Sequence, residues 1–172
     1  MADFTDLEKE NLVSSAMRLK DDDLPIMLII DAANMVKYKM PHELNTVFKE
    51  DIIKFVNDFK GGKLSPYVQS LKYDKPEENG LKQIIGNKWD NYVYDTSKDV
   101  LVLIFQDKVN EWTIHTVCDN FMRNVWEPLA KEVEDIEDLM IASFNINHNE
   151  LHHLAVDSVP TVKYYPKTDK SF

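Results

Sequence analysis

The chain has 172 residues, of which 44% are hydrophobic and 29% are charged, and its formal net charge is −10 at pH 7. This composition is typical of a soluble globular protein and excludes disorder of the whole chain. The negative charge argues against a nucleic-acid partner, because such binding depends on neutralising phosphates. No apolar run approaches the roughly 20 residues that a membrane-spanning helix needs.

The ends of the chain and its histidines narrow the range of functions further. Residues 1–6 lack the pattern of a secretory signal, and residues 168–172 match no retention or lipidation signal. His148 and His152 are four residues apart, a spacing seen in metal sites, but no third ligand is evident. We therefore expect neither a metal nor a cofactor.

Hydrophobic spacing in the first part of the chain predicts a helix, two paired strands and a second helix. In chain order these elements cover residues 4–20, 26–30, 36–40 and 49–60. Gly61 and Gly62 follow the second helix, as glycine commonly does at a helix end. The stretch from Leu64 to Gly80 contains two prolines, a glycine and mixed charges, which indicates a connection between two units.

Strands and helices are expected to alternate in the second part of the chain. The predicted strands are 81–85, 100–105, 139–144 and 161–165, and the predicted helices are 88–94, 118–133 and 150–156. Residues 106–116 are polar and match neither pattern. This alternation predicts an α/β sandwich with a mixed sheet.

Several segments, taken in order, resemble the protein disulfide isomerase family. In the second part they are Gly86–Asp90, Ser97–Val102, Val125–Ala130, Leu139–Ala142, Asn149–Glu150 and Val159–Pro166, and in the first part Asp23–Pro25, Tyr38–Lys39 and Ile53–Pro66. The resemblance implies a thioredoxin-like domain at residues 81–172, lacking its last strand and helix. It also implies a partial thioredoxin-like unit, the back half of one, at residues 1–68, and a linker at residues 69–80.

The chain departs from the family where the family has its catalytic Cys-x-x-Cys motif. Counting back along the helix places the motif at Thr116, Val117, Cys118 and Asp119, and counting forward from the strand places it at residues 113–116. Neither position holds two cysteines. The family's buried glutamate, its arginine before the cis proline and its helix-bending proline correspond to Leu103, Asp157 and Asn124. The resemblance thus implies a site without dithiol chemistry, which needs two thiols and groups that tune them.

The interpretation that follows is a redox-inactive protein that binds unfolded polypeptide or one fixed protein partner, as a chaperone or adaptor. The resemblance implies cis peptides at Val159–Pro160 and Leu24–Pro25, and it implies the endoplasmic reticulum lumen as the compartment. We expect peptide-binding residues around the cis proline, where an extended peptide can add as a strand. They are Trp112, Cys118, Ser158, Val159 and Pro160.

Three alternatives stay open at this point. Cys118 can serve a one-cysteine thiol oxidoreductase, which predicts an exposed thiol, or it can be a small buried hydrophobe. The chain can be a structural subunit of a larger assembly, which predicts a large apolar patch. It can also be a fragment of something longer. Trp126 lies on the apolar face of its helix and is expected in the core.

Overall fold

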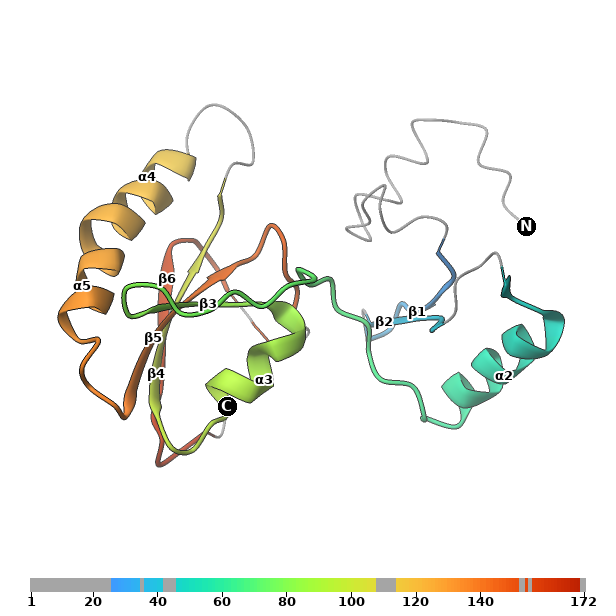
Figure 1. Ribbon diagram of the computed structural model, residues 1–172. Helices are drawn as coiled ribbons and strands as arrows, with labels where there is room; N and C mark the ends of the chain where they lie inside the picture. Colours follow the sequence, from blue (N-terminus) through green and yellow to red (C-terminus); the bar gives the residue numbers. More distant parts are fainter. Residues whose placement is uncertain are drawn as a thin grey trace. The chain divides into compact units, whose positions relative to one another are not determined.

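The computed structural model describes residues 26–34, 36–41, 46–107, 114–151, 154 and 156–170, with the side chains of residues 114–116 left out (Figure 1). It divides into two compact units, Met1–Gln69 and Ser70–Phe172. The predicted helix at 4–20 and the predicted cis peptide at Leu24–Pro25 lie outside the described residues. No helix in the described part of the chain is long and apolar enough to cross a membrane.

The first unit contains a two-stranded sheet and one helix. Strands β1 (Leu28–Asp31) and β2 (Val36–Lys39) pair antiparallel, as predicted. The Asp31 carboxylate accepts hydrogen bonds from the next backbone N–H groups of the turn, at residues 33 and 34. Helix α2 (Lys49–Lys60) has the predicted bounds. The rings of Tyr38 and Phe59, 5.2 Å apart, join β2 to α2.

The second unit is built on a four-stranded mixed sheet. Its strands are β3 (Leu81–Ile84), β4 (Asp99–Phe105), β5 (Leu139–Asn145) and β6 (Thr161–Tyr165). The strand order is β3-β5-β4-β6, with β3 and β4 parallel to β5 and β6 antiparallel to β4. The predicted fold class, a thioredoxin-like α/β fold with a mixed sheet, is confirmed.

One face of this sheet packs against helix α3 (Trp89–Val93), which follows a 3₁₀ turn, η3 (Gly86–Lys88). Successive residues of a strand point to opposite faces. Alternate residues of β4 and β5 therefore join Trp89 in one buried cluster. The sheet members of this cluster are Ile84, Val100, Val102, Ile104, Met140, Ala142, Phe144 and Tyr165.

The opposite face packs against a long helix in three parts: α4 (Ile114–Phe121), the π-helical η4 (Met122–Trp126) and α5 (Glu127–Glu132). Trp126 and Ala130 bury against Leu103 and Ile141. The indole Nε1 of Trp126 donates a hydrogen bond to the backbone oxygen of Ala142 at 2.9 Å. Trp126 is therefore a core residue, as predicted.

The stretch before β3 contacts the second unit directly. Asn149 is 1% exposed, and its Oδ1 accepts hydrogen bonds from the backbone N–H groups of Leu71, at 3.1 Å, and Gly86, at 2.9 Å. The ammonium group of Lys82 pairs with the carboxylate of Asp74 at 2.8 Å. Much of the segment predicted as a linker is thus fixed by hydrogen bonds to the domain that follows it.

Two predicted helices need correction. The described residues of 150–156 are not helical, because Leu151, Leu154 and Val156 all pack against the cluster beneath α3 and this packing overrides local preference. The helix predicted at 118–133 is already present at Ile114 and contains a π-helical segment. Asn124, where the resemblance led us to expect the family's helix-bending proline, lies in that segment.

Candidate functional site

The candidate site lies at the edge of the sheet where β4 ends and β6 begins. Because β6 is antiparallel to β4, with Thr161 opposite Ile104, the residues before Thr161 lie beside the C-terminal end of β4. The peptide bond between Val159 and Pro160 is cis. Ser158 is exposed, and Val159 is partly buried against the core cluster. The fold therefore places residues 158–160 at this edge, beside the end of β4.

Polar side chains surround the same ends of β4 and β5. The Nε2 atom of His148 lies 3.0 Å from a carboxylate oxygen of Asp107, and the side-chain amide of Asn147 donates to the other at 2.8 Å. Burial raises the pKa of Asp107, but hydrogen bonds from Asn145, Asn147 and His148 outweigh burial and lower the pKa overall. These contacts hold the strand ends together, and the cluster contains no nucleophile.

The expected motif position lies inside helix α4. Cys118 is 0% exposed, whereas its neighbour Val117 is exposed. Asp119 lies 3.9 Å from the guanidinium of Arg123. Thr116 belongs to α4, but its side chain is outside the described residues, as is the whole of Trp112. The described side chains at this position thus offer a buried thiol and no second sulfur.

No protein-family model matches the sequence, but curated proteins do. Human protein disulfide-isomerase A2 is 28% identical over 86% of this chain, and Drosophila melanogaster protein disulfide-isomerase is 29% identical over 96%. Protein disulfide isomerase-like 1-4 of Oryza sativa is 32% identical over 72%. The chain is a relative of the protein disulfide isomerases. It spans 27%, 32% and 21% of the length of these three relatives.

Within this disulfide isomerase relative, the positions that the resemblance singled out have ordinary structural surroundings. Leu103, expected at the place of a buried glutamate, is fully buried against Trp126 and Ile141. Asp157, expected at the place of an arginine, is exposed. A leucine side chain can neither accept nor donate a proton, so Leu103 supplies no acid–base group for thiol chemistry.

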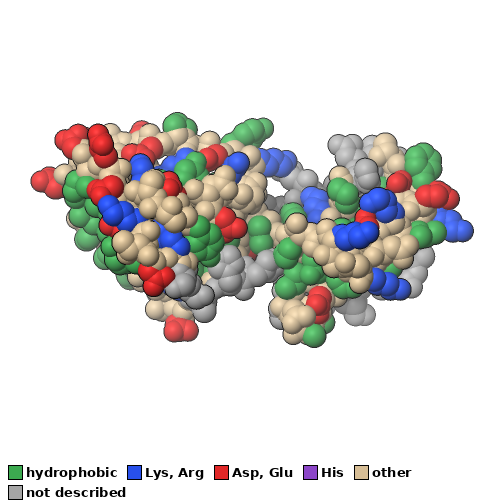
Figure 2. Space-filling view, turned by 90° about the horizontal axis from the view of Figure 1, so that it is seen from below, with side chains coloured by type: hydrophobic (Ala, Val, Ile, Leu, Met, Phe, Trp, Pro, Cys, Tyr) green, Lys and Arg blue, Asp and Glu red, His purple; other side chains and the backbone are tan. Residues whose placement is uncertain are grey.

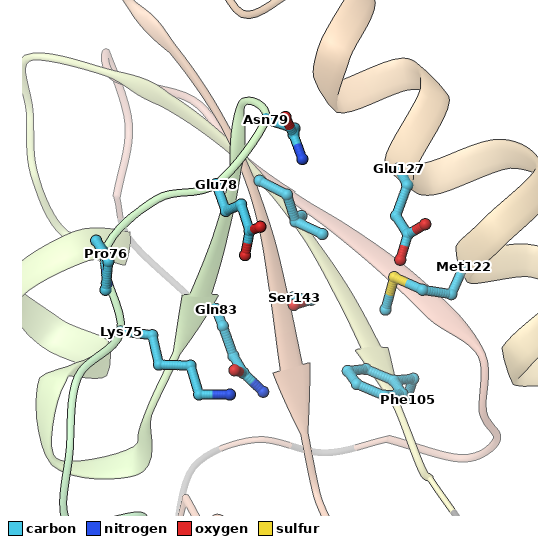
Figure 3. Close-up of a pocket in the computed structure, with 10 residues that line it drawn as sticks. Lys75, Pro76, Glu78, Asn79, Gln83, Phe105, Met122, Glu127 and Ser143 are labelled. Atoms are coloured by element: carbon cyan, nitrogen blue, oxygen red, sulfur yellow. The ribbon is translucent and has the colours of Figure 1, made fainter.

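Sequence reasoning missed one feature of the second unit, a cavity of about 530 Å³ on the side of the sheet away from α3 (Figure 3). It is lined by residues of the stretch that was predicted as a linker, by β3 and by the long helix. The dipeptide Asn79–Gly80 was the available signal, because this pair favours a tight hairpin turn that folds the preceding residues back along the next strand.

Proposed function

We propose that this chain is a redox-inactive relative of the disulfide isomerases that binds unfolded polypeptide, or one fixed protein partner, at the edge formed by Ser158, Val159 and Pro160. The observation that carries the redox part is the burial of Cys118, which is the chain's one cysteine. Dithiol exchange needs an accessible thiolate and a second thiol to resolve the mixed disulfide. This chain has no second thiol, and the thiol that it has is enclosed.

The binding part of the proposal rests on the edge strand β6. Among the described strands β6 pairs with β4 alone, so its other side is available to an extended peptide. Val162 and Tyr164 are exposed on β6, and Ser158 is exposed just before it. Main-chain hydrogen bonds from the strand would supply affinity, and the exposed apolar side chains would supply contact area.

The surface of the described residues fits a polypeptide better than a polyanion. Acidic, basic and hydrophobic side chains are interspersed on the face shown in Figure 2, and the chain as a whole carries a charge of −10. A mixed surface accommodates varied sequences, whereas nucleic acid requires clustered positive charge. The resemblance to disulfide isomerases leads us to add the endoplasmic reticulum lumen to the proposal, which fractionation of the native source would test.

The redox proposal is tested by thiol reactivity and by catalysis of disulfide exchange. Cys118 in the native protein should react slowly with an aromatic disulfide reagent, and quickly once the chain is unfolded in denaturant. The protein should not accelerate the reduction of insulin by dithiothreitol above the rate without it. Fast reaction of the native thiol, or catalysis that disappears in Cys118→Ser, would favour the one-cysteine oxidoreductase instead.

The binding proposal is tested with a permanently reduced and alkylated unfolded protein as the probe. Ser158→Trp places a bulky side chain at the proposed edge and should weaken binding of the probe. Ser97→Trp makes the same change at an exposed turn before β4, at the opposite end of that strand, and should leave binding unchanged. Equal binding by both variants would exclude this edge, and self-association of the chain would favour the structural subunit.

A further inference from the structure

The cavity on the second unit lies between the edge strand β3 and the long helix. Ser143 of β5 lies at its floor, between a wall that carries Lys75 and Glu78 and an opposite wall that carries Met122 and Glu127 (Figure 3). Its volume of about 530 Å³ falls within the range that small-ligand pockets occupy. The cavity is therefore large enough for a long side chain or a small organic molecule.

One wall of the cavity is fixed by a tight turn. Asn79 and Gly80 have φ angles of 51° and 75°, and Glu78 and Leu81 exchange backbone hydrogen bonds of 3.1 and 3.0 Å across them. Two left-handed residues in succession are typical of a type I′ turn. A Cβ atom on Gly80 would lie 2.3 Å from the carbonyl oxygen of Ala130, so the turn sits directly on α5. A wall held in this way is formed before any ligand binds, which lowers the cost of binding.

The floor of the cavity carries polar groups that form no hydrogen bond with the described residues. Ser143 is 4% exposed, yet no described residue forms a hydrogen bond with its hydroxyl, which faces the cavity. The amide of Gln83, on the neighbouring strand, also lines the cavity without a partner among the described residues. Buried polar groups are normally hydrogen-bonded, so the Ser143 hydroxyl favours a ligand that brings a donor. The amide of Gln83 is partly exposed and can pair with the same ligand. Phe105 and Met122 supply apolar surface beside them.

The charged side chains at the walls of the cavity determine which charge on the ligand is favoured. Glu78 and Glu127 carry carboxylates on opposite sides, and Lys75 is the one cation among the lining residues. The nearby ammonium of Lys82 is engaged by Asp74 and by the carbonyl oxygen of Lys75. An anionic ligand would face two carboxylates, and a wholly apolar ligand would leave Ser143 unpaired. A cation on an apolar stem can pair with the carboxylates of Glu78 and Glu127 and can donate a hydrogen bond to the hydroxyl oxygen of Ser143.

We propose that this cavity binds an ammonium or guanidinium group carried on an aliphatic stem. The stem packs against Phe105 and Met122, and the charged head donates to the carboxylates of Glu78 and Glu127 and to the oxygen of Ser143. A lysine or arginine side chain of a polypeptide and a free alkyl diamine share this chemistry. The proposal goes beyond peptide binding at Pro160 and does not depend on it.

The test is a titration of the full ¹⁵N-labelled chain, followed by the amide signals of Gln83, Ser143 and Glu127. The ligands are 1,5-diaminopentane, a short peptide with one lysine, and the same peptide with norleucine, which keeps the stem but removes the charge. We expect the lysine peptide to bind about two- to five-fold more tightly than the norleucine peptide, which is the range typical of an exposed ion pair. This preference should vanish in about 1 M salt, where the screening length is roughly 3 Å.

Variants that remove one carboxylate charge test whether Glu78 and Glu127, on the two walls, cause the preference for the lysine peptide. Glu78→Gln and Glu127→Gln should each weaken binding about two- to five-fold, whereas Glu137→Gln, at an exposed turn outside the cavity, should not change it. Binding of the lysine peptide without the diamine identifies a polypeptide side chain as the ligand, and the reverse identifies a free amine. Equal binding of lysine and norleucine peptides, no binding of either cation, or unchanged binding in both wall variants would overturn the proposal.

The same titration separates this proposal from the proposed function. Ser158→Trp should weaken binding of the alkylated unfolded protein and leave the response of Gln83 and Ser143 to the diamine or lysine peptide intact. If the response at the cavity disappears in Ser158→Trp although the variant is folded, the cavity is not an independent site and the inference fails.

Discussion

The two faces of the four-stranded sheet differ in how completely they are packed. Beneath α3 the face is closely packed, with Trp89 in edge-to-face contact with Phe144 at 4.9 Å and Tyr165 at 5.8 Å. Beneath the long helix the face is apolar around Trp126 but opens toward β3 into a cavity with a polar floor. A packed face contributes stability, and an incompletely filled face leaves room for a ligand.

The comparison is sharpest at two neighbouring residues of β5 that point to opposite faces. Phe144→Ala should lower the free energy of unfolding by about 3–5 kcal/mol, because it leaves a cavity under α3. Ser143→Ala should change it by less than about 0.5 kcal/mol, because the hydroxyl has no partner to lose among the described residues. Denaturant unfolding followed by tryptophan fluorescence measures both. Similar losses for the two variants would show that the faces contribute equally.

A substitution at Gly80 should destabilise the turn that forms one wall of the cavity. Gly80→Ala should cost about 3 kcal/mol or more, because a left-handed backbone is unfavourable for alanine and the new methyl group meets the Ala130 carbonyl. Gly62→Ala is the matched control: Gly62 also has a positive φ, of 65°, but an added Cβ there meets nothing within 4 Å. It should cost only about 1–2 kcal/mol. Thermal unfolding followed by circular dichroism compares them, and equal losses would rule out close packing at Gly80.

A smaller loss than at Phe144 or Gly80 is expected at the polar edge formed by the ends of β4 and β5. The pKa of Asp107 is lowered in the folded protein, so its ionised form stabilises the fold above the ordinary value of 3.8. That contribution is lost as the pH falls through the lowered pKa. Asp107→Asn should cost about 1 kcal/mol at pH 7 and flatten the acid limb of the stability profile. An unaltered acid limb in Asp107→Asn would contradict the assignment.

Part of the fold followed from local patterns. The apolar run Val100–Phe105 predicted β4 within one residue, and the amphipathic pattern with Gly61 after it predicted the bounds of α2. Ser158, Val159 and Pro160 lie at the edge of the sheet, and their role in peptide binding stays a prediction. The burial of Cys118 could not be predicted from the sequence, because it depends on which side chains pack against the helix, and these come from distant parts of the chain.

The sequence by itself determined the alternation of strands and helices, the absence of a second thiol and the kinship with disulfide isomerases, because these depend on residue identity and short-range spacing. Only the tertiary structure decided that residues 70–80 fold against the second unit, that the described residues of 150–156 pack without forming a helix, and that a cavity opens beside β3. Each of these depends on contacts between residues far apart in the chain, such as Asn149 with Leu71 and Gly80 with Ala130, which no local pattern encodes.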